Sequence, residues 1–249
     1  MNLDQVIANR SNKTIYRSGN FAVKVFSEDF SKADILSEAL NQARVEETGL
    51  NIPAVEEVLK IDGKWAIVSD FVEGKTLAQM VDEAPDKKAE YIELMTNLQI
   101  LVHSKQAANL NRLREKMHRK ISLANLDDAT KYELQTRLES RPKHYKVCHG
   151  DFFFSNIIVR PDGTPYILDW SHATQGNASA DVARTYLLFW LSGDIAGAEL
   201  YLKLYAEKTS TPKHYVKSWL PIVAASQSLK GNEKEREFLL SWATVVDFE

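Results

Sequence analysis

The sequence lacks most features that mark secreted, membrane or nucleic-acid-binding proteins. It has one cysteine among 249 residues, Cys148, so no disulfide can form within the chain. The first residues, MNLDQVIANRSNK, lack the apolar core of a signal peptide, and no apolar run approaches the roughly 20 residues that span a bilayer. The formal net charge of −3 gives no reason to expect nucleic-acid binding. We therefore expect a cytoplasmic protein that binds neither membranes nor nucleic acid.

Glycine and proline are also sparse, which argues against long disordered or low-complexity segments. The chain has ten glycines and seven prolines. Hydrophobic residues make up 44% and charged residues 26%, as in ordinary globular proteins. A chain of this length can bury a sizeable core in one large domain or in two lobes.

The first quarter of the chain is expected to form two β-hairpins with a helix between them. The expected strands are Thr14–Ser18, Phe21–Phe26, Val55–Ile61 and Lys64–Val68. Two-residue turns, Gly19-Asn20 and Asp62-Gly63, join them in pairs. Between the hairpins, Ser31 can cap a helix that runs to about Glu47. This order predicts a small β-rich lobe over residues 1–68.

After a connector at residues 69–74 the pattern becomes mostly helical. Tyr91–Val102 is amphipathic, and residues 111–140 are expected to form two charged helices. A strand-rich stretch from Tyr145 to Leu168 is followed by further helices. We therefore predict an α+β fold with two lobes, in which residues 69–74 are a hinge and residues 75–249 a larger helical lobe.

Three polar residues lie in strongly apolar surroundings within residues 147–170. They are Asp151, Asn156 and Asp169. Burying a carboxylate costs several kcal/mol unless it is paired or binds a metal. Carboxylate and amide oxygens are the ligands that Mg²⁺ prefers, and a carboxylate can also accept a hydroxyl proton. The alternative is that all three are turn and cap residues between short strands.

The same residues resemble two motifs of the aminoglycoside phosphotransferase and choline kinase superfamily. His149-Gly150-Asp151, followed by Asn156, resembles the motif HGD-x4-N, and Leu168-Asp169-Trp170 resembles the motif (I/L)DW. The spacings also resemble those of protein kinases, in which an aspartate and an asparagine five residues apart precede a metal-binding aspartate. The resemblance implies a protein-kinase-like fold.

The resemblance implies specific roles for these residues. Asp151 would be the catalytic base, and His149 would hold the catalytic loop. Asn156 and Asp169 would bind Mg²⁺ that bridges the phosphates of ATP. The acceptor would be a hydroxyl group of a small molecule.

The first lobe would supply the rest of the nucleotide site. Lys24, at the centre of the strand Phe21–Phe26, matches the lysine that holds the α- and β-phosphates in kinases. Glu38, in the middle of the following helix, is the expected partner of Lys24. Ser69, Asp70 and Phe71 would form the hinge whose backbone contacts the adenine edge.

One segment departs from the kinase pattern. Kinases cover the phosphates with a glycine-rich loop, but residues 9–14 contain no glycine. This departure argues against a conventional protein kinase. An atypical protein serine/threonine kinase and a nucleotide-binding pseudokinase remain as alternatives.

The distribution of charge bears on the acceptor. Residues 105–146 contain eleven basic and five acidic residues, which form either two solvated helices or a basic flap for an anionic substrate. Residues 190–249 contain eight acidic and seven basic residues. A polycationic aminoglycoside would need a strongly acidic pocket, so we expect a different acceptor.

Overall fold

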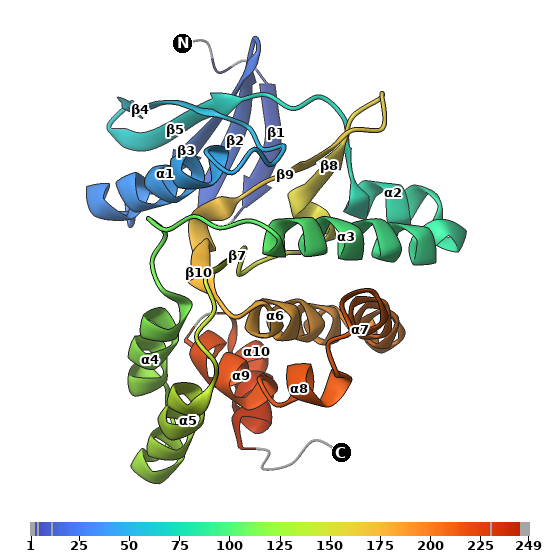
Figure 1. Cartoon of the computed structure of the whole chain (residues 1–249). Coiled ribbons are helices and arrows are strands. Elements are labelled where there is room, and N and C mark those ends of the chain that lie inside the picture. Colours follow the sequence, from blue (N-terminus) through green and yellow to red (C-terminus); the bar gives the residue numbers. More distant parts are fainter. Residues whose placement is uncertain (1–2, 4, 11, 230, 245–249) are drawn as a thin grey trace. The chain divides into compact units, whose positions relative to one another are not determined.

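The computed structural model describes residues 3, 5–10, 12–229 and 231–244, and it divides into two compact units. Unit 1 consists of Met1–Glu83 and Phe154–Ala173, and unit 2 consists of Ala84–Phe153 and Thr174–Glu249. The expected hinge at residues 69–74 lies inside unit 1, and the lobe boundary stays a prediction. The order of elements along the chain can be followed in Figure 1.

Unit 1 contains an antiparallel five-stranded sheet in the order β1-β2-β3-β5-β4. Its strands are β1 (Gln5–Arg10), β2 (Lys13–Ser18), β3 (Phe21–Phe26), β4 (Val55–Ile61) and β5 (Lys64–Asp70). Both predicted hairpins are therefore confirmed. Sequence reasoning missed β1, because this edge strand is mostly exposed and carries no apolar alternation. It also ended β5 two residues early, because Ser69 and Asp70 still pair with β3.

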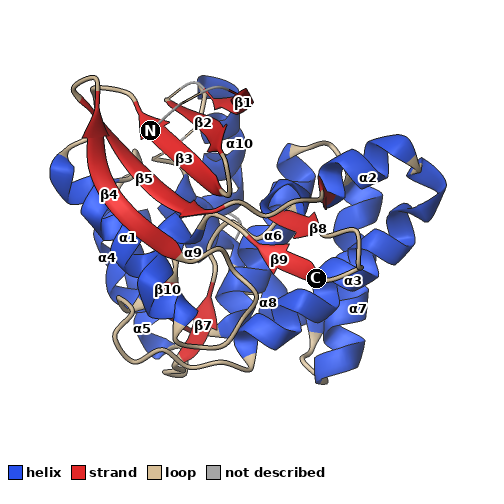
Figure 2. Ribbon diagram, turned by 90° about the horizontal axis from the view of Figure 1, so that it is seen from above, coloured by secondary structure: helices blue, strands red, loops and turns tan. Residues whose placement is uncertain are grey.

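Helix α1 (Lys32–Glu46) packs against β4 and β5 of this sheet (Figure 2). Its start is set by Ser31, as predicted. The Ser31 hydroxyl accepts a hydrogen bond from the Asp34 N–H, and the Asp34 carboxylate accepts one from the Ser31 N–H. Ile35 and Ala39 are buried against Phe26 and Ile67 of the sheet, so burial of this face fixes the side of α1 that meets the strands.

The rest of unit 1 forms a second, three-stranded sheet in the order β6-β8-β9. The elements are β6 (Lys75–Thr76), α2 (Leu77–Glu83), η2 (Phe154–Asn156), β8 (Ile157–Val159), β9 (Pro165–Ile167) and η3 (Trp170–His172). Gly74, just before β6, has a φ of 153°, and a Cβ atom there would lie 2.3 Å from the Val159 carbonyl oxygen. Only glycine allows the chain to approach β8 so closely.

Unit 2 is mainly helical. Its elements are η1 (Pro85–Lys87), α3 (Lys88–His103), α4 (Leu113–Leu123), α5 (Asp128–Ser140), β7 (Lys146–Cys148), β10 (Thr174–Gly176), α6 (Ala178–Leu191), α7 (Ile195–Thr209), α8 (Lys213–Lys217), α9 (Leu220–Gln227) and α10 (Glu233–Ala243). Helices α6 and α9 are almost entirely buried, and α3, α4, α7 and α10 pack around them. Strands β7 and β10 pair antiparallel. In the described residues, no helix is both long and apolar enough to cross a bilayer.

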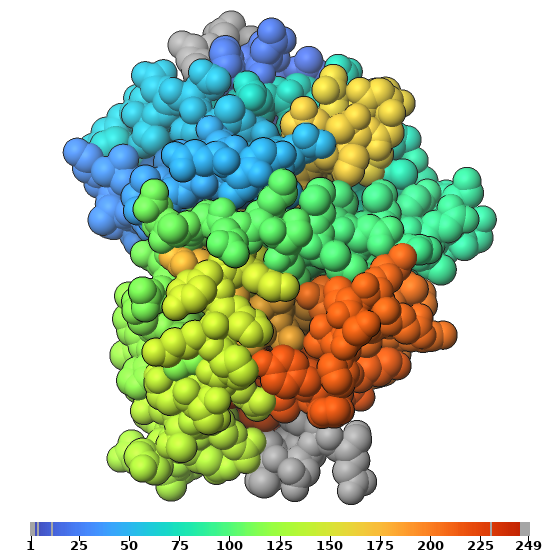
Figure 3. All heavy atoms as spheres, in the orientation of Figure 1, coloured from blue at the N-terminus to red at the C-terminus, as the bar shows by residue number. Residues whose placement is uncertain are grey.

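The basic stretch at residues 105–146 contains the two predicted charged helices, α4 and α5. Each buries only two residues, Met117 and Ile121 in α4 and Leu134 and Leu138 in α5. Figure 3 shows α5, in yellow-green, at the surface of the molecule. The charged side chains of these helices therefore lie mostly in solvent, as the simpler interpretation of the charge count expected.

Candidate active site

Asp169 lies between β9 and η3 in a backbone conformation that side chains rarely adopt. Its φ is 59° and its ψ is 65°, in the left-handed region. Such conformations in residues other than glycine concentrate at functional sites. Asp169 precedes the turn η3, but its side chain makes no capping hydrogen bond. The alternative that Asp169 is a simple cap residue therefore fails.

The side chain of Asp169 is instead held by two lysines. Lys13 Nζ donates to Asp169 Oδ2 at 2.9 Å, and Lys24 Nζ lies 3.7 Å from Oδ1. Burial opposes ionisation of this carboxyl, but Lys24 and Lys13 outweigh it and hold its pKa well below the ordinary range. Asp169 is therefore an anion throughout the physiological pH range.

Lys24 pairs with Glu38, as the sequence predicted. Lys24 Nζ, in the middle of β3, donates to Glu38 Oε1 on α1 at 2.6 Å. Burial lowers the pKa of Lys24, but Asp169 and Glu38 together raise it above its usual value. Glu46, in the last turn of α1, instead accepts a hydrogen bond from the Val55 N–H at 2.8 Å.

Sequence reasoning missed Lys13. This residue belongs to the glycine-free stretch at residues 9–14, of which Ser11 lies outside the described residues. The stretch joins β1 to β2, with Arg10 opposite Lys13. A lysine at the start of an exposed strand carries no signal by itself, because its partner Asp169 is 156 residues away in the sequence.

These groups line a pocket of about 510 Å³ within unit 1. Lys13, Lys24 and Asp169 line it together with Asn156, which ends the turn η2. The expected hinge residues Ser69, Asp70 and Phe71 also line it, together with Val72. The structure thus brings Lys24, Asn156, Asp169 and the expected hinge residues to one pocket. Glu38 does not line this pocket but pairs with Lys24, which does.

In the expected hinge, some backbone N–H groups already donate to other parts of the chain. The Asp70 N–H donates to the Ala54 carbonyl at 3.0 Å, and the Phe71 N–H donates to the Asn20 carbonyl at 2.8 Å. Among the described residues, the Val72 N–H takes part in no hydrogen bond. Val72, which also lines the pocket, is therefore the residue among Asp70, Phe71 and Val72 whose N–H remains as a donor.

The pocket suits a magnesium ion whose coordination is completed by phosphate oxygens. Asp169 Oδ1 is buried and accepts no hydrogen bond in the described part of the chain, so this oxygen has a lone pair available for a cation. No group of three His, Cys, Asp or Glu side chains in the described residues could hold a metal by itself. Mg²⁺ is commonly bound by one or two carboxylates together with substrate phosphates, so the donor set fits this ion.

Asp151 belongs to unit 2 and pairs with a buried arginine. Arg184 Nη2, on α6, lies 3.3 Å from Asp151 Oδ1, and the Asp151 side chain is 38% exposed. The Asp151 N–H donates to Nδ1 of the fully buried His149 at 3.2 Å. His149 therefore holds the backbone of the loop, which agrees with the scaffold role expected for it.

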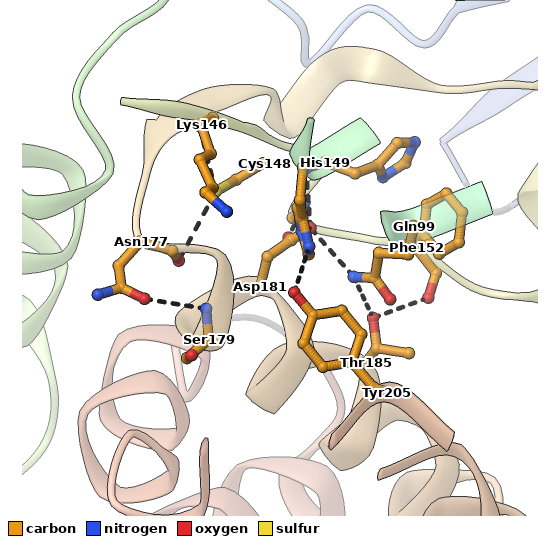
Figure 4. Close-up of polar contacts among 12 residues, drawn as sticks. Gln99, Lys146, Cys148, His149, Phe152, Asn177, Ser179, Asp181, Thr185 and Tyr205 are labelled. Carbon is orange, nitrogen blue, oxygen red and sulfur yellow. Dashed lines mark hydrogen bonds and ion pairs between the residues drawn. The ribbon is translucent and has the colours of Figure 1, made fainter. Parts of the chain in front are cut away.

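The same loop is anchored on Asp181 (Figure 4). The Gly150 N–H donates to Asp181 Oδ1 at 2.6 Å, and the His149 N–H donates to Oδ2 at 3.1 Å. Gln99 Nε2 and His103 Nε2 also contact Oδ2, at 3.1 Å and 3.0 Å. Burial opposes ionisation of Asp181, but the bonds from His103 and Gln99 lower its pKa to about 2. Asp181 lies inside the first turns of α6, whose start is capped by Asn177.

Cys148 is not a nucleophile. Its thiol is buried, with Sγ 3.7 Å from the Asn177 carbonyl oxygen, and burial raises its pKa well above the usual value. A thiol that stays protonated is a poor nucleophile.

The profile of the phosphotransferase enzyme family matches residues 4–214. The chain belongs to this phosphotransferase family. The motifs at residues 149–156 and 168–170, on which the resemblance rested, lie inside the matched region. No curated protein sequence matches the chain.

Solved structures of phosphotransferases share the fold of the chain. Aminoglycoside phosphotransferase APH(4)-Ia superposes with a TM-score of 0.71 at 13% identity, covering 96% of this chain and 90% of that one. Choline kinase LicA from Streptococcus pneumoniae gives 0.63 at 16% identity, with 98% and 92% covered. A choline/ethanolamine kinase family protein from Mesorhizobium loti gives 0.62 at 14% identity, with 97% and 88% covered. The predicted α+β, protein-kinase-like fold is therefore confirmed.

Proposed function

We propose that this phosphotransferase moves the γ-phosphoryl group of ATP to a hydroxyl group of a small molecule. The observation that supports this most is the set of charged groups in the pocket of unit 1, where Lys24, paired with Glu38, lies 3.7 Å from Asp169. Phosphoryl transfer from a nucleotide requires a cation that binds the phosphates and, beside it, a carboxylate that binds the metal. APH(4)-Ia, which shares the fold, has been crystallised in a ternary complex with AMP-PNP and hygromycin B.

The pocket provides a place for each part of the nucleotide. The adenine would lie against the hinge, where the Val72 N–H can donate to a ring nitrogen and carbonyl groups of Ser69, Asp70 or Phe71 can accept from the amino group. The phosphates would lie at Lys24. Asn156 and Asp169 would hold Mg²⁺, which when bound supplies positive charge to the phosphate oxygens.

Asp151 would act as the base. The acceptor oxygen attacks the γ-phosphorus while the bond from that phosphorus to the β,γ-bridging oxygen breaks, and ADP leaves with the electron pair. The hydroxyl proton passes to Asp151. Hydrogen bonds from the loop to Asp181 and His149 keep the backbone of Asp151 in one position, and Arg184 fixes its carboxylate.

Arg184 also bears on the class of acceptor. Its guanidinium is mostly buried and pairs with the Asp151 carboxylate, so the two charges offset each other. The pair gives a polycationic acceptor no surplus of negative charge to bind, which favours a neutral, zwitterionic or acidic alcohol. This agrees with the nearly balanced charge of residues 190–249.

A nucleotide-consumption screen tests the proposal. The purified protein is incubated with ATP, Mg²⁺ and amino alcohols, sugars, homoserine-like compounds or aminoglycosides, and ADP release is followed. We expect release that depends on one class of alcohol and on Mg²⁺. ATP binding without any turnover would instead support the pseudokinase alternative, and phosphorylation of protein substrates alone would support the atypical protein kinase.

A further inference from the structure

Lys13 occupies a fixed place at the start of β2, next to the short connection from β1. It begins β2, where its partners are Arg10 on β1 and Phe26 on β3. The neighbouring Asn12 carbonyl accepts a hydrogen bond from the Ser27 N–H at 3.0 Å, which ties this end of β2 to the end of β3. The backbone of Lys13 is therefore held on both sides, and its side chain is directed to Asp169.

The charges around Asp169 are balanced by two lysines. Lys13 and Lys24 contribute two positive charges, and Glu38 and Asp169 contribute two negative charges. Lys24 is shared between Glu38 and Asp169, whereas Lys13 is paired with Asp169. The Lys13 side chain is only 18% exposed, so this ion pair is partly shielded from solvent.

A divalent cation on Asp169 would replace Lys13 as the counter-charge. Lys13 and Lys24 already share this carboxylate, and a divalent cation on Oδ1 would add two further positive charges beside them. The added repulsion would move the ammonium group of Lys13 off Oδ2. Its flexible four-carbon side chain lets it stay in the pocket, where a nucleotide brings several negative charges. Kinases use the backbone of a glycine-rich loop at this place, and residues 9–14 contain no glycine.

From this geometry we infer that Lys13 is a phosphate-binding residue that takes the place of the glycine-rich loop. The inference rests on the proposed function, since it assumes that the pocket binds a nucleotide. Lys13 neutralises Asp169 before a nucleotide binds and holds the terminal phosphates once it has bound. A lysine suits this task because its ammonium is a compact charge that needs no fixed approach angle to a phosphate oxygen.

Calorimetry with adenosine, MgADP and MgATP tests this role in the full chain. Lys13→Met keeps the apolar part of the side chain and removes the charge, and Lys13→Arg keeps the charge. Lys64→Met is the matched control, because Lys64 is exposed at the start of β5 and does not line the pocket. We expect Lys13→Met to weaken MgATP binding roughly ten- to a hundredfold, the range of one hydrogen bond to a charged group. MgADP binding should weaken less and adenosine binding should not change.

Each outcome decides the inference. Lys13→Arg should keep MgATP affinity within about threefold of the wild type, and Lys64→Met should not alter any affinity. Unchanged or tighter MgATP binding by Lys13→Met would overturn the inference and show that Lys13 only competes with the metal. An equal loss for adenosine would also overturn it, because the sheet itself would then be damaged. If the wild type bound neither adenosine nor MgATP, the proposed function would fail together with the role of Lys13.

Discussion

At the scale of single residues, the site depends on carboxylates that stay charged inside a partly apolar pocket. Asp169 remains ionised because Lys24 and Lys13 offset the cost of its burial. Its left-handed backbone conformation is unfavourable for aspartate by itself, so the surrounding structure must hold it. The burial and the backbone conformation of Asp169 therefore favour a functional role for its carboxylate over a contribution to the stability of the fold.

Replacement of Asp169 should separate metal binding from folding. We expect Asp169→Ala to abolish the Mg²⁺ dependence of ATP binding, since Asn156 alone offers only a neutral oxygen. Calorimetry with ATP, with and without Mg²⁺, measures this. Adenosine affinity serves as the control, because the hinge is untouched. MgATP affinity equal to that of the wild type would place the metal elsewhere.

At the scale of elements, the loop of Asp151 depends on one residue of α6. Asp181 accepts hydrogen bonds from two backbone N–H groups of this loop and from the side chains of Gln99 and His103. All of these groups are buried in unit 2 or nearly so. The loop of Asp151 is thus attached to a helix that is itself almost entirely buried.

Asp181→Ala should destabilise the protein strongly, because it leaves buried donors without acceptors. Each such donor costs about 1–3 kcal/mol, so we expect a total loss of about 3 kcal/mol or more in the free energy of unfolding. Asp127→Ala is the matched control, since Asp127 only caps the exposed start of α5 and should cost about 1 kcal/mol. Urea denaturation measures both. Equal losses for the two variants would contradict the account of the Asp181 network.

Local signals in the sequence were enough to predict most of these elements. The turn at Gly19-Asn20 and the cap at Ser31 act over a few residues, so both hairpins and α1 were predictable. The pair of Lys24 and Glu38 was also predictable, but only through the resemblance to kinases. The contacts of Lys13 with Asp169 and of Asp181 with the loop were not, because they join residues 156 and about 30 positions apart with no local pattern.

At the scale of the whole molecule, acid should unfold the protein partly through Asp181. Its pKa is about 2 in the folded state, below the ordinary value of 3.8, so ionised Asp181 stabilises the fold above about pH 4. This contribution, about 2 kcal/mol, is lost as the pH falls from about 4 to 2. Urea denaturation at several pH values in this range measures the effect. The free energy of unfolding should decrease less steeply with falling pH in Asp181→Asn than in the wild type. Identical pH dependence in the two proteins would show that Asp181 does not contribute to unfolding by acid.

The charge of the molecule also predicts which acceptors fail. Residues 190–249 are nearly neutral, and Arg184 offsets the negative charge of Asp151. We therefore expect kanamycin-like and gentamicin-like compounds to be poor substrates in steady-state kinetics beside small metabolic alcohols. A kcat/KM of about 10⁴ M⁻¹s⁻¹ or more for any of them, the range of good substrates of ordinary enzymes, would show this reasoning to be wrong.

The central claim is that Asp151 serves a phosphoryl transfer from ATP, and Asp151→Asn tests it most directly. The measurement compares the rate of phosphorylated product formation with MgATP affinity in the same preparation. We predict a rate that falls about 10²–10⁴-fold, the range of general-base assistance, while MgATP affinity stays within about twofold, because Lys24 and Asp169 are unchanged. A variant that keeps more than about half of the wild-type rate would contradict the assignment of Asp151 as the base.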